Sequence, residues 1–389
     1  MSKLEEFLKK ECPDGVEYKQ IKDIAKINRG IIISKKYIEE NKGDYPVYSS
    51  QTENNGELGR INNYAYDGEY LTWTTDGANA GSVFYRNEKF NITNVCGLIK
   101  ITEDNIITKF VYYILHIYAP KYVNRGMGNC KLMSNVMESI SIPIPPIEVQ
   151  KEIVRILDTF TKYQDLLNRE LELRKKQYEY YRDKLLSFGD EVEKIQLKDL
   201  FYTKNGYTPS KSNPEFWDSK DVSWFRMEDI RENGRILNEA IQKVSFSAIK
   251  GNVFPKNSII VSTSATIGEH ALITCESLAN QRFTYLILKD EYKNKFNIFF
   301  LFYYCYKLKE YCLNCLNQGN FASVDMTKFN KFEFPIISLK EQERIVKILD
   351  QFDTLCNDIT RGLPAEIELR KKQYEYYRDK LLTFKEKKK

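Results

Sequence analysis

The amino-acid sequence predicts an α+β fold: two mixed α/β globular domains joined by two long helices that form an antiparallel coiled coil, with pseudo-two-fold symmetry. The main observation is a repeat, because residues 170–188 (ELELRKKQYEYYRDKLLSF) recur at 366–384 (EIELRKKQYEYYRDKLLTF) with 17 of 19 positions identical. A weaker echo precedes each copy, QKEIVRILDTF from Gln150 and QERIVKILDQF from Gln342. The other observation is that the two segments outside these helices are similar in length and order. A period of about 190 residues is far too long for a solenoid and indicates a duplicated half-molecule.

Length and composition agree with a chain of several domains. A length of 389 residues favours two or three domains. We expect globular domains at residues 1–145 and 191–337, and helical segments at 146–190 and 338–389. The net charge of +5 permits a nucleic-acid partner without demanding one. Because the chain has no run of 18 apolar residues and no signal peptide, we expect a cytoplasmic protein that does not enter a membrane.

Each copy of the repeat, taken with its echo, carries the apolar pattern of a coiled-coil helix. Steps of three and four residues form a heptad seam, in which Gln164 and Arg174 fill gaps between the apolar or aromatic side chains of the first helix. The seam comprises Ile153, Leu157, Phe160, Leu167, Leu171, Tyr178, Tyr181 and Leu185 in the first helix, and Ile345, Leu349, Phe352, Cys356, Ile359, Ile367, Tyr374, Tyr377 and Leu381 in the second. Each helix should follow a proline-containing entry and run for about 40 residues, or about 60 Å. Four extra residues near Gly362 and Pro364 should kink or break the second helix.

The two globular segments share an order of elements. Each opens with a short amphipathic strand, at 16–21 and 194–197, followed by a short helix and a glycine, Gly30 or Gly206. A hydroxyl-rich strand and turn, a tyrosine-rich helix and a Gly/Asn loop then follow, at 71–81, 110–118 and 125–129 in the first segment and at 260–268, 296–313 and 318–320 in the second. The segments differ in sequence while the helices are nearly identical, which suggests domains that were exchanged or retuned for different targets.

Motifs for catalysis or metal binding are weak. Cys312 and Cys315 form one C-x2-C pair with no second pair, so we expect reduced thiols and no zinc site. His116 and His270 are the only histidines, which leaves little for acid–base chemistry. The string NPEF from Asn213 lacks the second proline of a methyltransferase motif, and no phosphate-binding loop is present. We therefore expect no catalytic residue, metal site or cofactor in this chain.

This layout resembles the specificity subunit of type I restriction–modification systems, in which two target-recognition domains are separated by a central helical repeat and followed by a C-terminal one. The string KNGYTP from Lys204, with Phe216-Trp217 after it, is similar to the family's G-x-T-P…[YF]-W opening, and PVYSS from Pro46 is similar to the alternative opening. The helix entries PPIEVQKEIV from Pro145 and PIISLKEQERIV from Pro335 also look like those of the family. The resemblance covers essentially the whole chain, which departs from it by the four extra residues near Gly362.

The resemblance implies a non-catalytic subunit that reads a bipartite sequence in double-stranded DNA. One domain would read each half-site, and the coiled coil would fix the gap between them. Two methyltransferase subunits would dock on the helices and methylate adenine N6, and restriction subunits with ATP-driven translocation would join them. S-adenosylmethionine, ATP and Mg are then expected on the partner subunits.

Base reading would use the amide and hydroxyl side chains of the loops, with basic residues beside them. The candidates in the first domain are Arg29, Lys35, Lys36, Ser49, Ser50, Gln51, Asn54, Thr74, Thr75 and Asn79. Those in the second domain are Lys204, Lys211, Arg226, Thr263, Ser264, Thr266 and Arg282.

Two other interpretations stay open. The chain could be the specificity subunit of a bipartite type II enzyme, which has the same layout and is separated only by its neighbouring subunits. It could also be a structural coiled-coil scaffold with two protein-binding domains. A scaffold would show no salt-dependent, sequence-selective binding to DNA.

Overall fold

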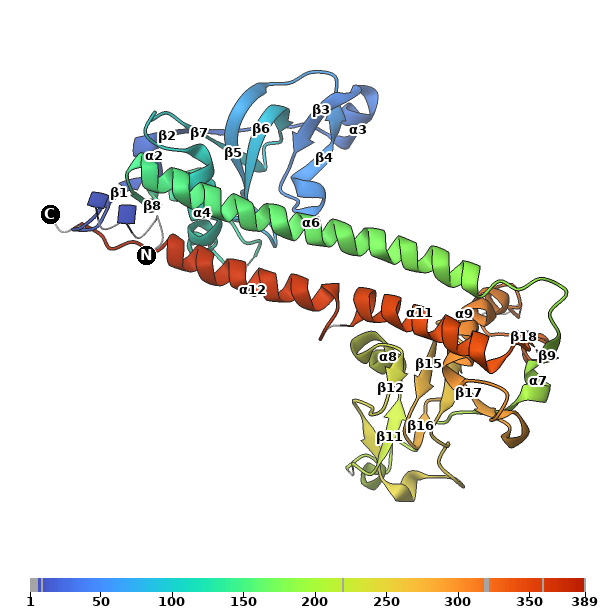
Figure 1. Cartoon of the computed structure of the whole chain (residues 1–389). Coiled ribbons are helices and arrows are strands. Elements are labelled where there is room, and N and C mark those ends of the chain that lie inside the picture. The colour runs from blue at the N-terminus through green and yellow to red at the C-terminus, as the bar shows by residue number, and fades with distance from the viewer. Residues whose placement is uncertain are drawn as a thin grey trace. The chain divides into compact units, whose positions relative to one another are not determined.

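The computed structural model describes residues 6–7, 10–126, 128–218, 220–317, 322–358 and 360–387. The chain divides into a first unit, Met1–Asp165 with Leu369–Lys389, and a second unit, Leu166–Glu368. Each unit contains one globular segment and part of each long helical segment (Figure 1). Ile359 of the expected seam, Met127 and the expected loop at 318–320 lie outside the described residues.

The first unit is built on a six-stranded sheet of order β2-β7-β5-β6-β3-β4, in which β3 and β6 are parallel and the other pairs antiparallel. Its strands are β1 (Glu17–Gln20), β2 (Ala25–Arg29), β3 (Lys42–Tyr48), β4 (Glu57–Ile61), β5 (Tyr66–Thr74), β6 (Val83–Ile92), β7 (Cys96–Ile101) and β8 (Ser141–Ile144). Its short helices are α2 (Ile21–Ile24), α3 (Lys35–Glu40), η1 (Glu53–Gly56), α4 (Thr108–Tyr118), η2 (Ala119–Tyr122) and α5 (Ser134–Ser139). Strands β1 and β8 form a separate antiparallel pair that closes the segment on itself.

The second unit has a five-stranded sheet of order β10-β17-β14-β15-β12 and a three-stranded sheet of order β13-β11-β16. Its strands are β9 (Lys194–Gln196), β10 (Phe201–Asn205), β11 (Val222–Phe225), β12 (Ile236–Leu237), β13 (Lys243–Val244), β14 (Ser258–Ser262), β15 (His270–Ile273), β16 (Ser277–Ala279), β17 (Phe283–Leu288) and β18 (Glu333–Pro335). Its short helices are α7 (Leu197–Leu200), η3 (Pro214–Phe216), α8 (Met227–Asn233), η4 (Phe246–Ala248), η5 (Asp290–Tyr292), α9 (Ile298–Leu313) and α10 (Met326–Phe329). Strands β9 and β18 pair antiparallel, as β1 and β8 do in the first unit.

The long helices agree with the sequence prediction. Helix α6 (Ile147–Leu185) is continuous over 39 residues. The C-terminal segment forms two helices, α11 (Leu339–Asn357) and α12 (Leu363–Leu381), so the predicted break is confirmed. Asp358 stabilises the break, because its carboxylate accepts hydrogen bonds from the main-chain N–H groups of Thr360 and Arg361 at 2.7 and 3.1 Å. A side chain at Gly362 would lie 2.3 Å from the carbonyl oxygen of Thr354, which explains the glycine.

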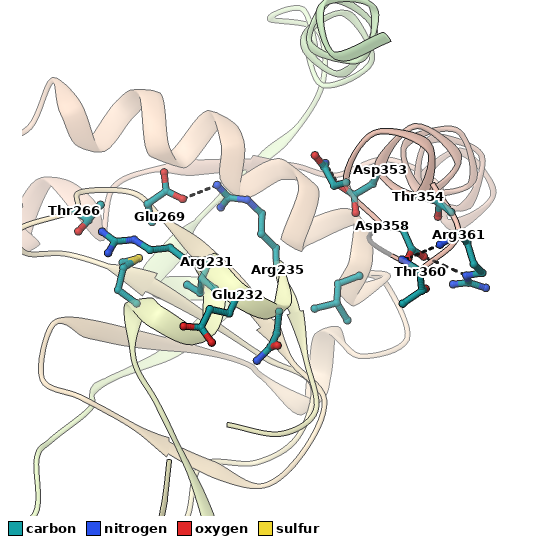
Figure 2. Close-up of a pocket in the computed structure, with 16 residues that line it drawn as sticks. Arg231, Glu232, Arg235, Thr266, Glu269, Asp353, Thr354, Asp358, Thr360 and Arg361 are labelled. Atoms are coloured by element: carbon teal, nitrogen blue, oxygen red, sulfur yellow. Dashed lines mark hydrogen bonds and ion pairs between the residues drawn. The ribbon is translucent and has the colours of Figure 1, made fainter. Parts of the chain in front are cut away.

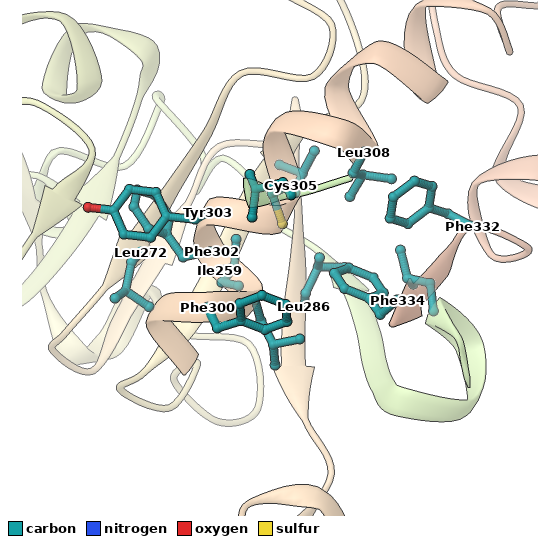
Figure 3. Packing of buried hydrophobic residues seen from close by; sticks show 14 of the residues in the cluster. Ile259, Leu272, Leu286, Phe300, Phe302, Tyr303, Cys305, Leu308, Phe332 and Phe334 are labelled. Carbon is teal, nitrogen blue, oxygen red and sulfur yellow. The ribbon is translucent and has the colours of Figure 1, made fainter. Parts of the chain in front are cut away.

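The tyrosine-rich helix of each unit packs between the sheet and a long helix. In the second unit, Ile259 and Leu286 of the sheet pack with Phe300 of α9 in a core that also contains Leu349 of α11 (Figure 3). In the first unit, α4 fills the same layer between β5 and the start of α6. The tyrosine-rich helices are therefore core elements that seat each sheet on a long helix.

Each unit repeats one aromatic contact of the antiparallel coiled coil. A phenylalanine of the echo packs against two tyrosine rings of the repeat, at equivalent positions in the two units. The distances between ring centroids are 6.3 Å for Phe160–Tyr374, 5.6 Å for Phe160–Tyr377, 6.0 Å for Tyr178–Phe352 and 5.7 Å for Tyr181–Phe352. The predicted α+β class, with mixed domains on an antiparallel helical pair, is confirmed.

A buried glutamine fastens each globular segment to its helix. Gln342 accepts a hydrogen bond from the N–H of Asn297 at 2.7 Å and donates to the carbonyl oxygens of Lys295 and Ile337, both at 2.9 Å. Gln150 makes the equivalent three bonds to residues 105, 107 and 145. A tyrosine hydroxyl also donates to an aspartate in each unit, Tyr113 to Asp158 at 2.5 Å and Tyr303 to Asp350 at 2.6 Å. The duplication therefore extends to individual hydrogen bonds.

Candidate nucleic-acid interface

The two globular segments share a local structure at one end of the sheet. Gly30 follows β2, and a Cβ atom there would lie 2.2 Å from the carbonyl oxygen of Ile92. Gly206 follows β10, and a Cβ atom there would lie 2.3 Å from the carbonyl oxygen of Ala279. No residue with a side chain fits at such distances, so both positions require glycine. The glycines let the loop before β7, or before β17, lie directly against the end of the neighbouring strand.

In the first segment, hydrogen bonds gather several candidate residues at this end. The Arg29 guanidinium donates to the Asn94 carbonyl oxygen at 2.7 Å and to Thr75 Oγ1 at 3.1 Å. The Asn79 amide donates to Thr52 Oγ1 at 2.9 Å, which joins the turn after β5 to the loop after β3. The loops that contain Arg29, residues 49–54 and residues 74–79 thus form one surface.

Not all candidates of this segment face solvent. Thr74 and Thr75 are buried, and their hydroxyls bond to main-chain carbonyl oxygens of residues 79 and 95. Their burial does not support direct contact with a base, and assigns both hydroxyls to shaping the turn. Asn54, Asn79, Lys35 and Lys36 are exposed, and Ser49, Ser50 and Gln51 are half-buried. Lys36 pairs with Glu40 across one helical turn at 3.7 Å, a weak exposed interaction.

In the second segment, four candidates meet at the equivalent end of the sheet. Thr263 Oγ1 lies 3.1 Å from Thr284 Oγ1, which donates to the Asn205 side chain at 2.8 Å. Lys204, next to Asn205, is exposed on β10, and Arg282 is exposed in the turn before β17. The Thr263 N–H donates to the Arg282 carbonyl oxygen at 2.9 Å, so the structure places Arg282 beside Thr263 and the adjacent Ser264, near Lys204 on β10.

The other three candidates of this segment lie elsewhere. Arg226 is the half-buried residue before α8, and its guanidinium lies 5.7 Å from the Trp224 ring centroid. Lys211 is exposed in the loop after β10. Thr266 lines a separate cavity. Arg226 therefore packs on a ring, whereas Arg282 is exposed.

The separate cavity has a volume of about 930 Å³ and lies between α8 and the break after α11 (Figure 2). Its charged lining is largely paired: Arg235 contacts Glu269 at 2.5 Å, and Arg361 contacts Asp358 at 3.1 Å. Burial raises the pKa of Asp353. No histidine or cysteine lines the cavity. The Thr360 hydroxyl of the lining donates to the Asp358 carboxylate at 2.6 Å, as part of the hydrogen bonds that stabilise the helix break.

The cysteines and acidic groups also lack the arrangement of a reactive centre. All eight cysteines are free thiols. Burial raises the pKa of Cys96 and of Cys312 to about 12, so both thiols stay protonated at neutral pH. Over the ranges that the structure describes, no group of three histidine, cysteine, aspartate or glutamate side chains could hold a metal ion. Within the same ranges, no helix is both long and apolar enough to cross a membrane.

Two residues of the candidate interface in the first segment, Arg86 and Asn55, were not predicted from the sequence. Arg86 lies in β6 on the same face as Phe84 and Phe90, and it is 1% exposed. The signal in the sequence was the alternation of β6, which places positions 84, 86, 88 and 90 on one face. An arginine among aromatic residues on such a face indicates a buried charge that donates hydrogen bonds to particular neighbouring groups.

Comparison with known proteins gives the family. A family model described as the type I restriction modification DNA specificity domain matches residues 13–174 and 189–369. A protein of Mycoplasma pneumoniae that is named as a type I specificity subunit is 36% identical over 373 residues, which cover 94% of this chain and 97% of that protein. The specificity subunit of the type I restriction enzyme EcoprrI of Escherichia coli is 55% identical over 214 residues, which span 53% of this chain and 53% of that relative.

A solved structure shows the same fold. The S subunit of a type I restriction–modification system from M. genitalium superimposes with a TM-score of 0.53 at 16% identity, covering 94% of this chain and 95% of that one. The chain therefore belongs to the type I restriction–modification DNA specificity family. The family membership confirms the resemblance found in the sequence and assigns the chain to the specificity component, not to a catalytic subunit.

Proposed function

We propose that this chain reads a bipartite sequence in double-stranded DNA as the specificity subunit of a type I restriction–modification enzyme. The target-recognition domains are residues 1–145 and 191–337, and each reads one half-site. The helical segments 146–190 and 338–389 hold them. The observation that carries the proposal is the pair of equivalent sheet ends, which present different amide, hydroxyl and basic side chains in the two domains. Unlike side chains on a duplicated frame suit two different half-sites.

The gap between the half-sites is set by the helical segments. Helix α6 is continuous over 39 residues, which corresponds to about 58 Å at 1.5 Å per residue. That length exceeds one turn of B-DNA, about 34 Å, so a two-part target with an unread middle is geometrically reasonable. A continuous helix is stiff enough to act as the ruler between two readers.

The exposed face of the repeat supports the docking of two methyltransferase subunits. Leu173 and Leu369 are 55% and 63% exposed, and Tyr180 and Tyr376 are 60% and 63% exposed. Positions 173 and 180 are one heptad apart and share a helix face, as do 369 and 376. Large apolar side chains at this exposure are typical of an interface, and aromatic residues often anchor one.

The echo shows how much exposed positions differ between the two copies outside the 19-residue repeat. It has four differences between its two copies, and three of them, Lys151/Glu343, Arg155/Lys347 and Thr159/Gln351, fall at positions exposed in both. Interior packing alone therefore permits substitutions at exposed positions of the helix. In the 19-residue repeat, Ser187 and Thr383 differ at an exposed position by a conservative change, whereas the exposed positions 172, 173, 175, 176, 179 and 180 have identical counterparts. An external partner, bound once per copy, accounts for that difference.

The methyltransferase subunits would supply S-adenosylmethionine and the methyl transfer to adenine N6, and restriction subunits with ATP and Mg would join them in the cytoplasm. Co-expression with the cognate methyltransferase subunit, followed by genome-wide mapping of N6-methyladenine, tests the proposal. A split motif with a fixed unread gap is the expected result. Active methyltransferase with no new methylated motif would instead favour the protein-binding scaffold. Neighbouring subunits of a bipartite type II enzyme would favour the type II system.

A further inference from the structure

A buried arginine supports the tip of one loop in the first domain from beneath. The loop, residues 49–56, connects β3 to β4 and is closed by a hydrogen bond from the Ser49 N–H to the Gly56 carbonyl oxygen at 3.0 Å. Asn54 and Asn55 have φ values of +48° and +53°. Two consecutive non-glycine residues in the left-handed region are unusual, and such strain needs support from the surroundings. Both asparagine side chains are exposed.

Arg86 provides this support. Its Nη2 donates to the Asn55 carbonyl oxygen at 2.8 Å, and its Nε donates to Thr72 Oγ1 at 3.2 Å. The guanidinium carbon lies 3.4 Å from the ring centroid of Tyr48, the last residue of β3. Arg86 therefore connects the floor of the sheet to the strained tip of the loop.

The position of Arg86 is costly for folding alone. The side chain is 1% exposed, and its Nη1 is buried without a hydrogen-bond partner among the described residues. Burying a charged group with an unsatisfied donor destabilises a protein, and an apolar residue of similar volume would be cheaper. A role in holding the loop explains why an arginine occupies this site.

The loop is also fixed from its other side. The Asn79 amide donates to Thr52 Oγ1 at 2.9 Å, and Arg29 joins the adjacent turn to β2. Gly56 has a φ of +80°, and a Cβ atom there would lie 3.2 Å from Arg86 Nη2. The tip is thus held at a defined place on the proposed DNA surface, with two amides directed outward from a rigid base.

We propose that Asn54 and Asn55 read an adenine of the first half-site and that Arg86 is the residue that positions them. An asparagine amide matches adenine because it donates to N7 and accepts from N6 in the major groove. A fixed main chain is needed for such bidentate contact, and the Arg86 bond to Asn55 provides it. This inference rests on the proposed function, and extends it to particular residues.

The test is N6-methyladenine mapping with the variants Asn54→Ala/Asn55→Ala and Arg86→Met, with Asn87→Ala as the matched control. Asn87 is the exposed neighbour of Arg86 on β6, and it lies opposite Glu69 of β5 in the sheet. We expect discrimination at one adenine position of one half-site to fall on the order of 10- to 100-fold in the first two variants. The other half-site and the gap should stay unchanged, and the control should match the wild type.

Two results would overturn the inference. One is an unchanged first half-site in Asn54→Ala/Asn55→Ala, and the other is relaxation at a base other than adenine. If Arg86→Met prevents folding, Gly56→Ala takes its place, because it displaces the tip and leaves the buried charge intact. A wild-type map without any split motif would contradict the proposed function itself, so the two failures are distinguishable.

Discussion

Lengthening α6 should widen the gap between the half-sites by a calculable amount. We consider a duplication of residues 166–169, four residues of α6 directly before the repeat. Four residues add about 6 Å of helix and turn its far end by about 40° beyond a full turn. Base pairs are about 3.4 Å apart along B-DNA. The preferred gap should therefore increase by one or two base pairs, with both half-site sequences unchanged.

The structure gives a reason why four residues should be tolerated. Phe160 and Tyr178, which make the repeated aromatic contacts, are 18 positions apart on α6, whereas Phe352 and Tyr374 are 22 apart. The C-terminal segment accommodates its extra residues in the break before α12. The duplication in α6 gives the two segments the same spacing, so the aromatic contacts of both units can form.

The assay is methylation mapping of the lengthened variant co-expressed with the methyltransferase subunit. The control inserts the same four residues between Thr360 and Arg361, in the break and outside regular helix. We expect the control to keep the wild-type gap because the extra residues extend a loop. Retained methylation with an unchanged gap in the α6 variant would refute the ruler, as would a change in the bases read.

Three further predictions concern stability and docking. Gln342→Ala should lower the free energy of unfolding by about 3 kcal/mol, because three main-chain groups lose their hydrogen-bond partner. Glu343→Ala gives the effect of an exposed substitution in the same urea unfolding experiment, and equal losses would contradict the assignment. Replacing Tyr180 and Tyr376 together by aspartate should abolish the stable complex with the methyltransferase subunit in size-exclusion chromatography with light scattering, and an intact complex would refute docking on this face. Burial lowers the pKa of His270 from 6.5 to about 3, so the unfolded chain takes up the proton first as the pH falls. The contribution of His270 to the free energy of unfolding should therefore be fully present above pH 6.5 and fall towards pH 3 by up to about 1.4 kcal/mol per pH unit. His270→Leu should flatten this decline in urea unfolding at a series of pH values. Parallel curves for variant and wild type would show that another group causes it.

The long helices could be predicted because their determinants are local. A seam with steps of three and four residues, a proline entry and four extra residues near Gly362 are all visible in the sequence. The packing at their ends could not be predicted. Leu186 and Leu382 are almost fully buried, one position beyond the half-buried Leu185 and Leu381 of the expected seam. The chain leaves the helix there, so these leucines pack on the globular segments and no longer follow the heptad.

The proposed DNA surface was less predictable because solvent exposure depends on tertiary contacts. Thr75 and Ser50 are both hydroxyl residues in polar turns, yet Thr75 is fully buried and Ser50 is half-buried. The support of Asn55 by Arg86 joins residues 31 positions apart. Composition locates a polar loop, but the residue that fixes it lies on β6, a strand distant in the sequence that pairs with β3 beside the loop.

The hydrogen bonds at the helix entries explain how recognition domains can change while the frame does not. Among the described residues, the hydrogen bonds of Gln150 and Gln342 go to main-chain groups, which any residue type can offer in the same backbone geometry, except that proline has no N–H. Contacts that depend on side chains of the domain include the tyrosine hydroxyl of Tyr113 or Tyr303 and the apolar side chains of α4 or α9 that pack on the long helix. A domain that keeps this loop, this tyrosine and the apolar face of its tyrosine-rich helix can be seated on the same long helix. Replacement of the reading loops therefore alters the half-site without altering the helices, and with them the gap between half-sites and the face proposed to bind the methyltransferase.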